Sequence, residues 1–248
     1  MHRTEPVVVL EGAALSYPTP GGEVSVLNGI HLAIEAGEIL AVTGPSGSGK
    51  SSLIAIIGGL EQVTGGSAVV LGIDLAKASE STRTRLRRRD IGVVFQSYHL
   101  VPAMTALENV ALPLILAGAS DALERAEAML ETMGLRHRLA HRPSALSGGE
   151  QQRVAIGRAF VTGPRLVLAD ESTGNLDQRT GEGIVLAMFE LARASGTALV
   201  FVTHDTKLAD RCERRIEIEA GQINADRRMH RTSREEGGHR AGVSARAY

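Results

Sequence analysis

A glycine-rich stretch carries the clearest chemistry in this 248-residue sequence. It reads Gly44-Pro-Ser-Gly-Ser-Gly-Lys-Ser51 and fits the pattern G-x-x-x-x-G-K-[ST] in full, after the apolar run Ile39–Thr43 and before a helix predicted from Lys50 to about Leu60. Backbone N–H groups in such a loop can surround a phosphate, and the helix dipole favours the negative charge. Lys50 is expected to reach the β- and γ-phosphates of a nucleotide, and the Ser51 hydroxyl to bind Mg²⁺. The alternative is a strand–helix turn without a ligand.

The residues expected to contact the nucleotide from this stretch are Gly44, Pro45, Ser46, Gly47, Ser48, Gly49, Lys50, Ser51 and Ser52.

Two carboxylates end a second apolar run, Arg165-Leu-Val-Leu-Ala-Asp-Glu171. Beside a bound nucleotide, Asp170 would hold Mg²⁺ through water, and Glu171 would polarise the attacking water as a general base. The alternative is an ordinary buried strand that ends in acidic residues. The phosphate-binding loop upstream favours the catalytic interpretation.

A third motif, Leu146-Ser-Gly-Gly-Glu-Gln-Gln-Arg153, opens a helix predicted to continue to Phe160. Ser147 and Glu150 have the spacing of a capping box, which is a sufficient structural explanation for those two residues. The capping box does not require Gly148 and Gly149. Two glycines at a helix N-terminus leave backbone N–H groups open to an incoming anion.

The elements that must position these motifs follow the pattern of an α/β protein. Short strands with turns between them are predicted first, and they indicate an antiparallel sheet. Later apolar runs are typical of buried parallel strands, and residues 105–160 are predicted to be helical, with Asp121 and Glu124 as a further capping box. The expected strands are Val7–Leu10, Ala13–Tyr17, Ile30–Ile34, Ile39–Thr43, Ile91–Phe95, Leu166–Ala169, Ala198–Thr203, Ile216–Glu219 and Gln222–Asn224.

Composition restricts the class of protein. Apolar residues make up 43% of the chain, enough for a sizeable core, and the net charge of −1 argues against a dedicated nucleic-acid binder. The single cysteine, Cys212, fits a reducing compartment. No signal peptide is expected, and no run reaches the ~18 apolar residues of a membrane helix, so a membrane role would require a partner.

The phosphate-binding loop, the Leu146–Arg153 motif and the Asp170–Glu171 strand, in this order, resemble the nucleotide-binding domain of ABC transporters over about residues 7–224. The resemblance implies a P-loop NTPase core with a parallel sheet, an N-terminal antiparallel β subdomain and a helical subdomain inserted at about 98–160. Residues 225–248, which are rich in Arg, are expected to form a disordered tail.

This family resemblance also implies the activity and the partners. The chain would hydrolyse ATP with Mg²⁺ as the motor subunit of a transporter, in the cytoplasm at the inner face of the cell membrane. It would drive a separate integral membrane permease. Two copies would sandwich ATP head to tail, with Ser147, Gly148 and Gly149 of one copy acting on the ATP of the other.

Further site residues follow from the resemblance alone. Tyr17 matches an aromatic residue that stacks on adenine, and Gln96 matches a glutamine that touches Mg²⁺ and the nucleophilic water. His204 matches a histidine that contacts the γ-phosphate, and Asp177 belongs to a loop that crosses the dimer interface. One departure from the family pattern is Ser172, where the family usually has Pro after the catalytic Glu.

Within the family, Gln96–Pro102 and Thr105–Val110 resemble the lipoprotein-releasing, macrolide-export and cell-division group (LolD, MacB, FtsE), and most closely its YbbA-like members. Their permeases have few membrane helices and a large extracytoplasmic domain. Two alternatives stay open. A regulatory ABC ATPase would control an extracytoplasmic enzyme through its permease. A soluble, non-transport ABC ATPase would carry a second ATPase domain, zinc modules or long coiled coils.

Two polar clusters are expected to be structural. Arg83, Arg85 and Arg87–Arg89 lack interleaved aromatic residues, and they are predicted to form a solvated helix face. His137 and His141 are predicted to be surface residues rather than ligands of a metal.

Overall fold

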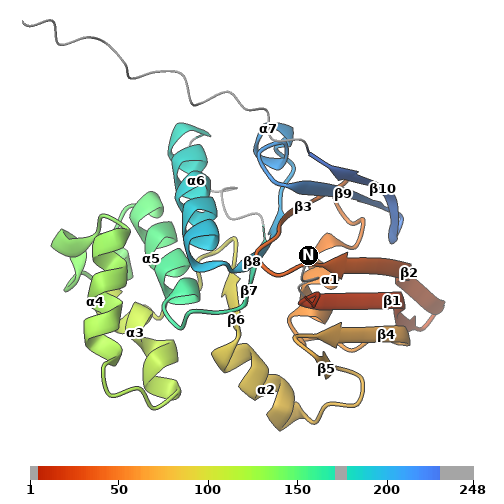
Figure 1. Cartoon of the computed structure of the whole chain (residues 1–248), viewed down its shortest axis with the longest axis horizontal. Coiled ribbons are helices and arrows are strands. Elements are labelled where there is room, and N and C mark those ends of the chain that lie inside the picture. Colours follow the sequence, from red (N-terminus) through yellow and green to blue (C-terminus); the bar gives the residue numbers. More distant parts are fainter. Residues whose placement is uncertain (1–4, 171–177, 230–248) are drawn as a thin grey trace, which may run out of the picture.

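The strands form two separate sheets in the computed structural model, which describes residues 5–170 and 178–229 (Figure 1). The smaller sheet is antiparallel, with the order β2-β1-β4-β5. Its strands are β1 (Val8–Thr19), β2 (Gly22–Ile34), β4 (Gly65–Val70) and β5 (Ile73–Asp74).

The larger sheet has the order β10-β9-β3-β8-β7-β6. All of its neighbours are parallel except β10, which pairs antiparallel with β9. Its strands are β3 (Ile39–Thr43), β6 (Ile91–Val94), β7 (Leu166–Asp170), β8 (Ala198–Val202), β9 (Arg214–Glu219) and β10 (Gln222–Arg228).

Helices cover both faces of the larger sheet, because side chains alternate between the faces along each buried strand. In β3, Ile39 and Ala41 join the core beneath α3 to α6, whereas Leu40 and Val42 join the core that contains α1 and the antiparallel sheet. Figure 1 shows these two layers on opposite sides of the parallel strands. The helices are α1 (Lys50–Ile57), α2 (Glu80–Arg89), α3 (Ala106–Leu116), α4 (Ala122–Thr132), α5 (Gly148–Phe160), α6 (Gln178–Ser195) and α7 (Thr206–Ala209), with 3₁₀ turns at Arg136–Arg138 and Pro143–Ala145.

The predicted α/β fold with an antiparallel sheet and a helical insertion is confirmed, but several strands differ from the prediction. Strands β4 and β5 were not predicted, and β2 begins at Gly22 rather than at Ile30. Val7–Leu10 and Ala13–Tyr17 are one strand, β1, which passes through an irregularity in its pairing near Gly12. The last strand, β10, continues past Asn224 to Arg228. Its backbone pairing with β9 continues as far as Arg228, opposite Arg214, and the Asp226 carboxylate accepts a hydrogen bond of 2.7 Å from Arg214 Nε on β9.

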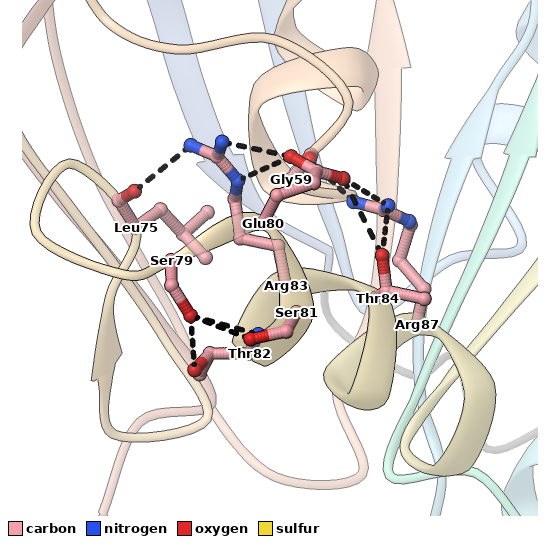
Figure 2. A network of polar contacts seen from close by, with 9 residues as sticks. All are labelled: Gly59, Leu75, Ser79, Glu80, Ser81, Thr82, Arg83, Thr84 and Arg87. Atoms are coloured by element: carbon pink, nitrogen blue, oxygen red, sulfur yellow. Dashed lines mark hydrogen bonds and ion pairs between the residues drawn. The ribbon is translucent and has the colours of Figure 1, made fainter.

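The arginine run on α2 is only partly solvated. Arg85, Arg88 and Arg89 are exposed as predicted, but Arg83 is buried. Figure 2 shows the Glu80 carboxylate between the guanidinium groups of Arg83 and Arg87, each 2.8 Å away.

Arg87 also donates a hydrogen bond of 2.6 Å to the carbonyl oxygen of Gly59, just beyond the end of α1. Carbonyls at a helix C-terminus lack partners within the helix, so an arginine there is satisfied by the backbone rather than by water. The prediction of a fully solvated arginine face was therefore wrong.

The capping box expected at Asp121 is absent. Helix α4 begins at Ala122 as that pattern suggested, but Asp121 makes no side-chain hydrogen bond to the helix. Its backbone lies at φ −98° and ψ 18°, outside the extended conformation that aims a capping side chain at the helix N-terminus.

Among the described residues, no helix is both long and apolar enough to span a membrane.

Candidate functional site

Several of the predicted residues lie at one edge of the larger sheet, because four neighbouring parallel strands end there. Val42 on β3 lies opposite Val202 on β8, and Val202 lies opposite Asp170 on β7. Gly44 and His204 each follow two residues beyond this row, and Gln96 follows the end of β6 at the same edge. Ligands of open α/β sheets bind outside the carboxyl ends of the strands, so this edge is the candidate site.

The loop after β3 has a shape that only glycine permits at two positions. Gly44 has φ +141°, and a Cβ atom there would lie 2.0 Å from the carbonyl oxygen of Ile218. Gly49 has φ +105°, and its Cβ would lie 2.7 Å from Leu27 Cδ2. The antiparallel sheet and the C-terminal hairpin therefore press on the loop from two sides, and they fix its path around the start of α1.

Polar groups in the loop fit a phosphate ligand. The Lys50 ammonium is buried, and it donates to the neutral carbonyls of Gly44, at 3.0 Å, and Pro45, at 2.8 Å. In the described part of the chain, the buried Ser48 hydroxyl has no hydrogen-bond partner. Among residues 5–170 and 178–229, no side chain caps α1, and the first turn of this helix has no acidic residue. A buried cation, an unpaired hydroxyl and an uncapped helix N-terminus together suit an anion.

The donor set also fits Mg²⁺ shared with phosphates. Ser51 is exposed in the first turn of α1, Asp170 ends β7, and Gln96 is exposed just beyond β6. Mg²⁺ in nucleotide sites keeps water and phosphate ligands and takes only one or two oxygens from the protein. The described residues contain no group of three or more His, Cys, Asp or Glu side chains that could hold a metal. Of the two histidines predicted to lie at the surface, His137 is exposed and His141 is half-buried.

The remaining residues of this edge are placed less directly. Thr203 N donates to Val42 O at 3.1 Å, so the segment that carries His204 is tied to the strand that leads into the phosphate-binding loop. Tyr17 lies on β1 and is 40% exposed. Partial burial, and then the nearby Glu61 carboxylate, raise the pKa of Tyr17. Glu171, Ser172 and Asp177 lie outside the described residues.

Ser147 is the N-cap of α5, and the predicted capping box is confirmed. The Ser147 hydroxyl accepts from Glu150 N at 3.3 Å, and the Glu150 carboxylate accepts from Ser147 N at 2.8 Å. Gly149 also has a packing role, because its Cβ would lie 2.9 Å from Thr180 Cγ2 on α6. Helix α5 belongs to the core on the opposite face of the sheet from α1.

Glu150 makes this cap sensitive to acid. Its carboxylate accepts from Ser147 N and, at 2.7 Å, from Arg138 Nε, and these donors lower its pKa from 4.5 to about 2. Since the pKa is lower in the folded state, the stabilisation is present above pH 4.5 and is lost as the pH falls toward 2.

We expect Glu150→Gln to lower the free energy of unfolding by about 1–2 kcal/mol at pH 7, because the charge-assisted bond from Arg138 is weakened. Thermal unfolding of both proteins from pH 6 down to pH 3.5 should show the difference shrinking. A difference that does not change with pH would contradict the role of the ionised carboxylate.

Two residues that hold the segment after Gln96 were missed from the sequence. Asn109 on α3 is fully buried, and its amide makes hydrogen bonds to Val101, Met104 and Thr105. Arg158 on α5 donates to the carbonyls of Tyr98 and His99. A polar residue at an apolar position of a helix was a visible signal for Asn109. The sequence offers no such signal for Arg158.

Comparisons with known proteins identify relatives of this chain. The family model described as ABC transporter matches residues 27–174. The lipoprotein-releasing system ATP-binding protein LolD of Alcanivorax borkumensis is 47% identical over 90% of this chain and 99% of that relative. The uncharacterized ABC transporter ATP-binding protein YbbA of Escherichia coli K12 is 48% identical over 82% of this chain and 90% of that relative.

A solved structure is similar as well. The ATP-binding cassette MJ0796, in a dimeric post-hydrolysis state bound to ADP and Pi, superposes with a TM-score of 0.83. It shares 38% sequence identity, and the match covers 90% of this chain and 99% of that one.

Proposed function

The chain belongs to the ABC transporter ATP-binding proteins, and on this basis we propose how its residues divide the work of ATP hydrolysis. It is the ATP-hydrolysing motor subunit of an ABC transporter, from the group of LolD and YbbA. The observation that supports the proposed roles is the common edge formed by the ends of β3, β8, β7 and β6.

The residues of one subunit bind the phosphates and position the water. The backbone from Gly44 to Ser52 surrounds the β-phosphate, and Lys50 exchanges its two carbonyl partners for phosphate oxygens. Ser51, Asp170 and Gln96 would hold Mg²⁺, which supplies charge neutralisation at the β- and γ-phosphates when it is bound. Glu171 accepts a proton from the attacking water, His204 contacts the γ-phosphate, and Tyr17 stacks on adenine.

The second half of each site comes from another copy. Ser147, Gly148 and Gly149 open α5, and α5 lies on the opposite face of the sheet from α1, whose start forms the phosphate-binding loop. This arrangement favours action on the ATP of a partner, in a head-to-tail dimer in which Asp177 lies at the interface. The related cassette MJ0796 is dimeric.

The motor acts on a membrane permease, and a groove of about 460 Å³ supplies a place for the permease to dock. Its lining combines apolar side chains, among them Phe95, Leu112 and Leu116, with Arg87 and Arg88. Leu116 is 58% exposed, which suits a contact that the isolated subunit leaves open. The group to which the chain is related suggests a permease with a large extracytoplasmic domain, and a location at the inner face of the membrane.

Mixing two inactive variants tests the composite site. Lys50→Ala removes the phosphate contact and Ser147→Arg blocks the N-terminus of α5, so each variant alone should have little ATPase activity. A mixed dimer contains one site with an intact loop and an intact α5 N-terminus. We expect the mixture to regain part of the wild-type activity, up to about a quarter if subunits pair at random.

The control is Ser144→Arg, an exposed serine just before the motif, which should stay active alone. Full activity of Ser147→Arg by itself would contradict action on a partner's ATP. The same conclusion would follow if both variants dimerise but their mixture has no more ATPase activity than Lys50→Ala or Ser147→Arg alone.

A further inference from the structure

The chain takes an unusual path directly after Gln96. Tyr98 and His99 both have positive φ, at 59° and 45°, in a region that residues other than glycine rarely adopt. A tight turn holds them, because Tyr98 N donates to Phe95 O at 3.2 Å and His99 N donates to Ser97 O at 2.6 Å. Two consecutive residues in this conformation require support from the surrounding structure.

Arg158 supplies that support. Its Nη1 donates to the carbonyl oxygen of His99 at 2.6 Å, and its Nη2 donates to that of Tyr98 at 2.8 Å. The planar guanidinium offers two parallel donors, and these two successive carbonyls accept both of them. The guanidinium is partly buried, and this burial lowers the pKa of Arg158.

Arg158 lies on α5, eleven residues after Ser147, which caps the same helix. One rigid helix therefore connects the motif that would meet the partner's ATP with the segment that carries Gln96. At the other end of this segment, Asn109 fixes Val101 and Met104 to α3. Residues 97–104 are thus fastened to the helical subdomain by Arg158 and Asn109. Gln96, which precedes them, lies just beyond the end of β6 in the sheet.

We propose that Arg158 is a positioning residue that sets Gln96 according to the position of α5. When α5 meets ATP on the partner subunit, the pair of hydrogen bonds carries its displacement to the turn at Tyr98 and His99, and so brings Gln96 to the metal and the water. This inference rests on the roles proposed above for Gln96 and Ser147.

The experiment measures steady-state ATP hydrolysis by the isolated subunit without permease, so that lost docking contacts cannot cause the effect. The variants are Arg158→Gln, Arg158→Lys, Gln96→Ala and the double variant Gln96→Ala/Arg158→Gln. The matched control is Arg125→Gln, because Arg125 Nη2 also donates to a backbone carbonyl, that of Val161 at 3.0 Å, but far from Gln96 in the chain.

We expect Arg158→Gln to lower kcat about tenfold or more while KM for ATP stays within about twofold, since small displacements of a positioning group act on the reacting geometry. Arg158→Lys should recover little, because an ammonium lacks the parallel fork. The double variant should be no slower than Gln96→Ala alone. Amide hydrogen exchange over residues 97–104 should be faster in both Arg158 variants and unchanged in Arg125→Gln.

Several outcomes would overturn the proposal. One is that Arg158→Gln folds and keeps a normal kcat while Gln96→Ala is slow. Gln96 would then keep its proposed role, but Arg158 would not position it. Another is a double variant in which the two effects multiply, because Arg158 would then act independently of Gln96. Unfolding of both Arg158 variants would show that the arginine serves the fold instead. Normal kcat in Gln96→Ala would overturn the role of Gln96 itself, and this inference with it.

Discussion

Replacement of Lys50 by alanine should lower the affinity for ATP by ~30- to 5,000-fold, the range that corresponds to losing one partner of a buried, hydrogen-bonded charge pair. The ammonium is buried within the loop, where it donates to two neutral carbonyls. The negatively charged oxygens of a phosphate would be attracted to this ammonium far more strongly than the neutral carbonyls are. Titration of the purified subunit with ATP, followed by calorimetry or by a fluorescent analogue, measures the loss.

Lys77→Ala is the matched control for this variant. Lys77 is exposed and pairs with Asp74 on the surface, at 2.8 Å, so its loss removes a lysine without touching the loop. The control should bind ATP as the wild type does. Equal affinity of Lys50→Ala and wild type, with both proteins folded, would refute the assignment of the loop as the nucleotide site.

The second large effect is expected from Glu171→Gln. Glu171 directly follows Asp170, the last residue of β7, and is the only carboxylate that we assign to proton abstraction. Loss of a general base slows a reaction by ~10²- to 10⁴-fold, whereas glutamine keeps the size of the side chain and therefore ATP binding. Measuring single-turnover hydrolysis and ATP affinity separately distinguishes a loss of the chemical step from a loss of ATP binding.

With hydrolysis blocked, ATP should hold two subunits together, so Glu171→Gln should elute as a dimer when ATP is present and as a monomer without it. Glu190→Gln, which changes an exposed carboxylate on α6, should behave as the wild type does. Turnover within a few-fold of wild type would exclude Glu171 as the base. An ATP-bound variant that remains monomeric would argue against the shared site.

Local chemistry in the sequence predicted the site because each motif works through its own backbone. The loop at Gly44–Ser51 needs glycine at fixed steps, a lysine and a helix start, all within eight residues. The capping box at Ser147 and Glu150 spans one turn of helix, and it formed as predicted. Continuous apolar runs indicated buried parallel strands, whose carboxyl ends share an edge. These features depend on neighbours in the chain, so the sequence determined them by itself.

Other features were decided only by contacts between distant segments. Aspartate is a common N-cap residue, but the turn before α4 places the backbone of Asp121 outside the extended conformation that a cap requires. Arg83 and Arg87 belong to a run whose composition is typical of a solvated face, yet the exposed carboxylate of Glu80 pairs with both of them and a carbonyl at the end of α1 accepts from Arg87. Strand β10 continues to Arg228 through backbone pairing with β9, and the contact between Asp226 and Arg214 joins the two strands.

Arg158 is the clearest case, because its partners, Tyr98 and His99, lie about sixty residues earlier in the chain. An arginine in a helix gives no sign of the carbonyl that it will meet, since every residue offers the same acceptor. The sequence by itself predicted which groups would bind phosphate and water. The tertiary structure decided which helix holds them in place, because long-range hydrogen bonds depend on packing geometry that no local pattern encodes.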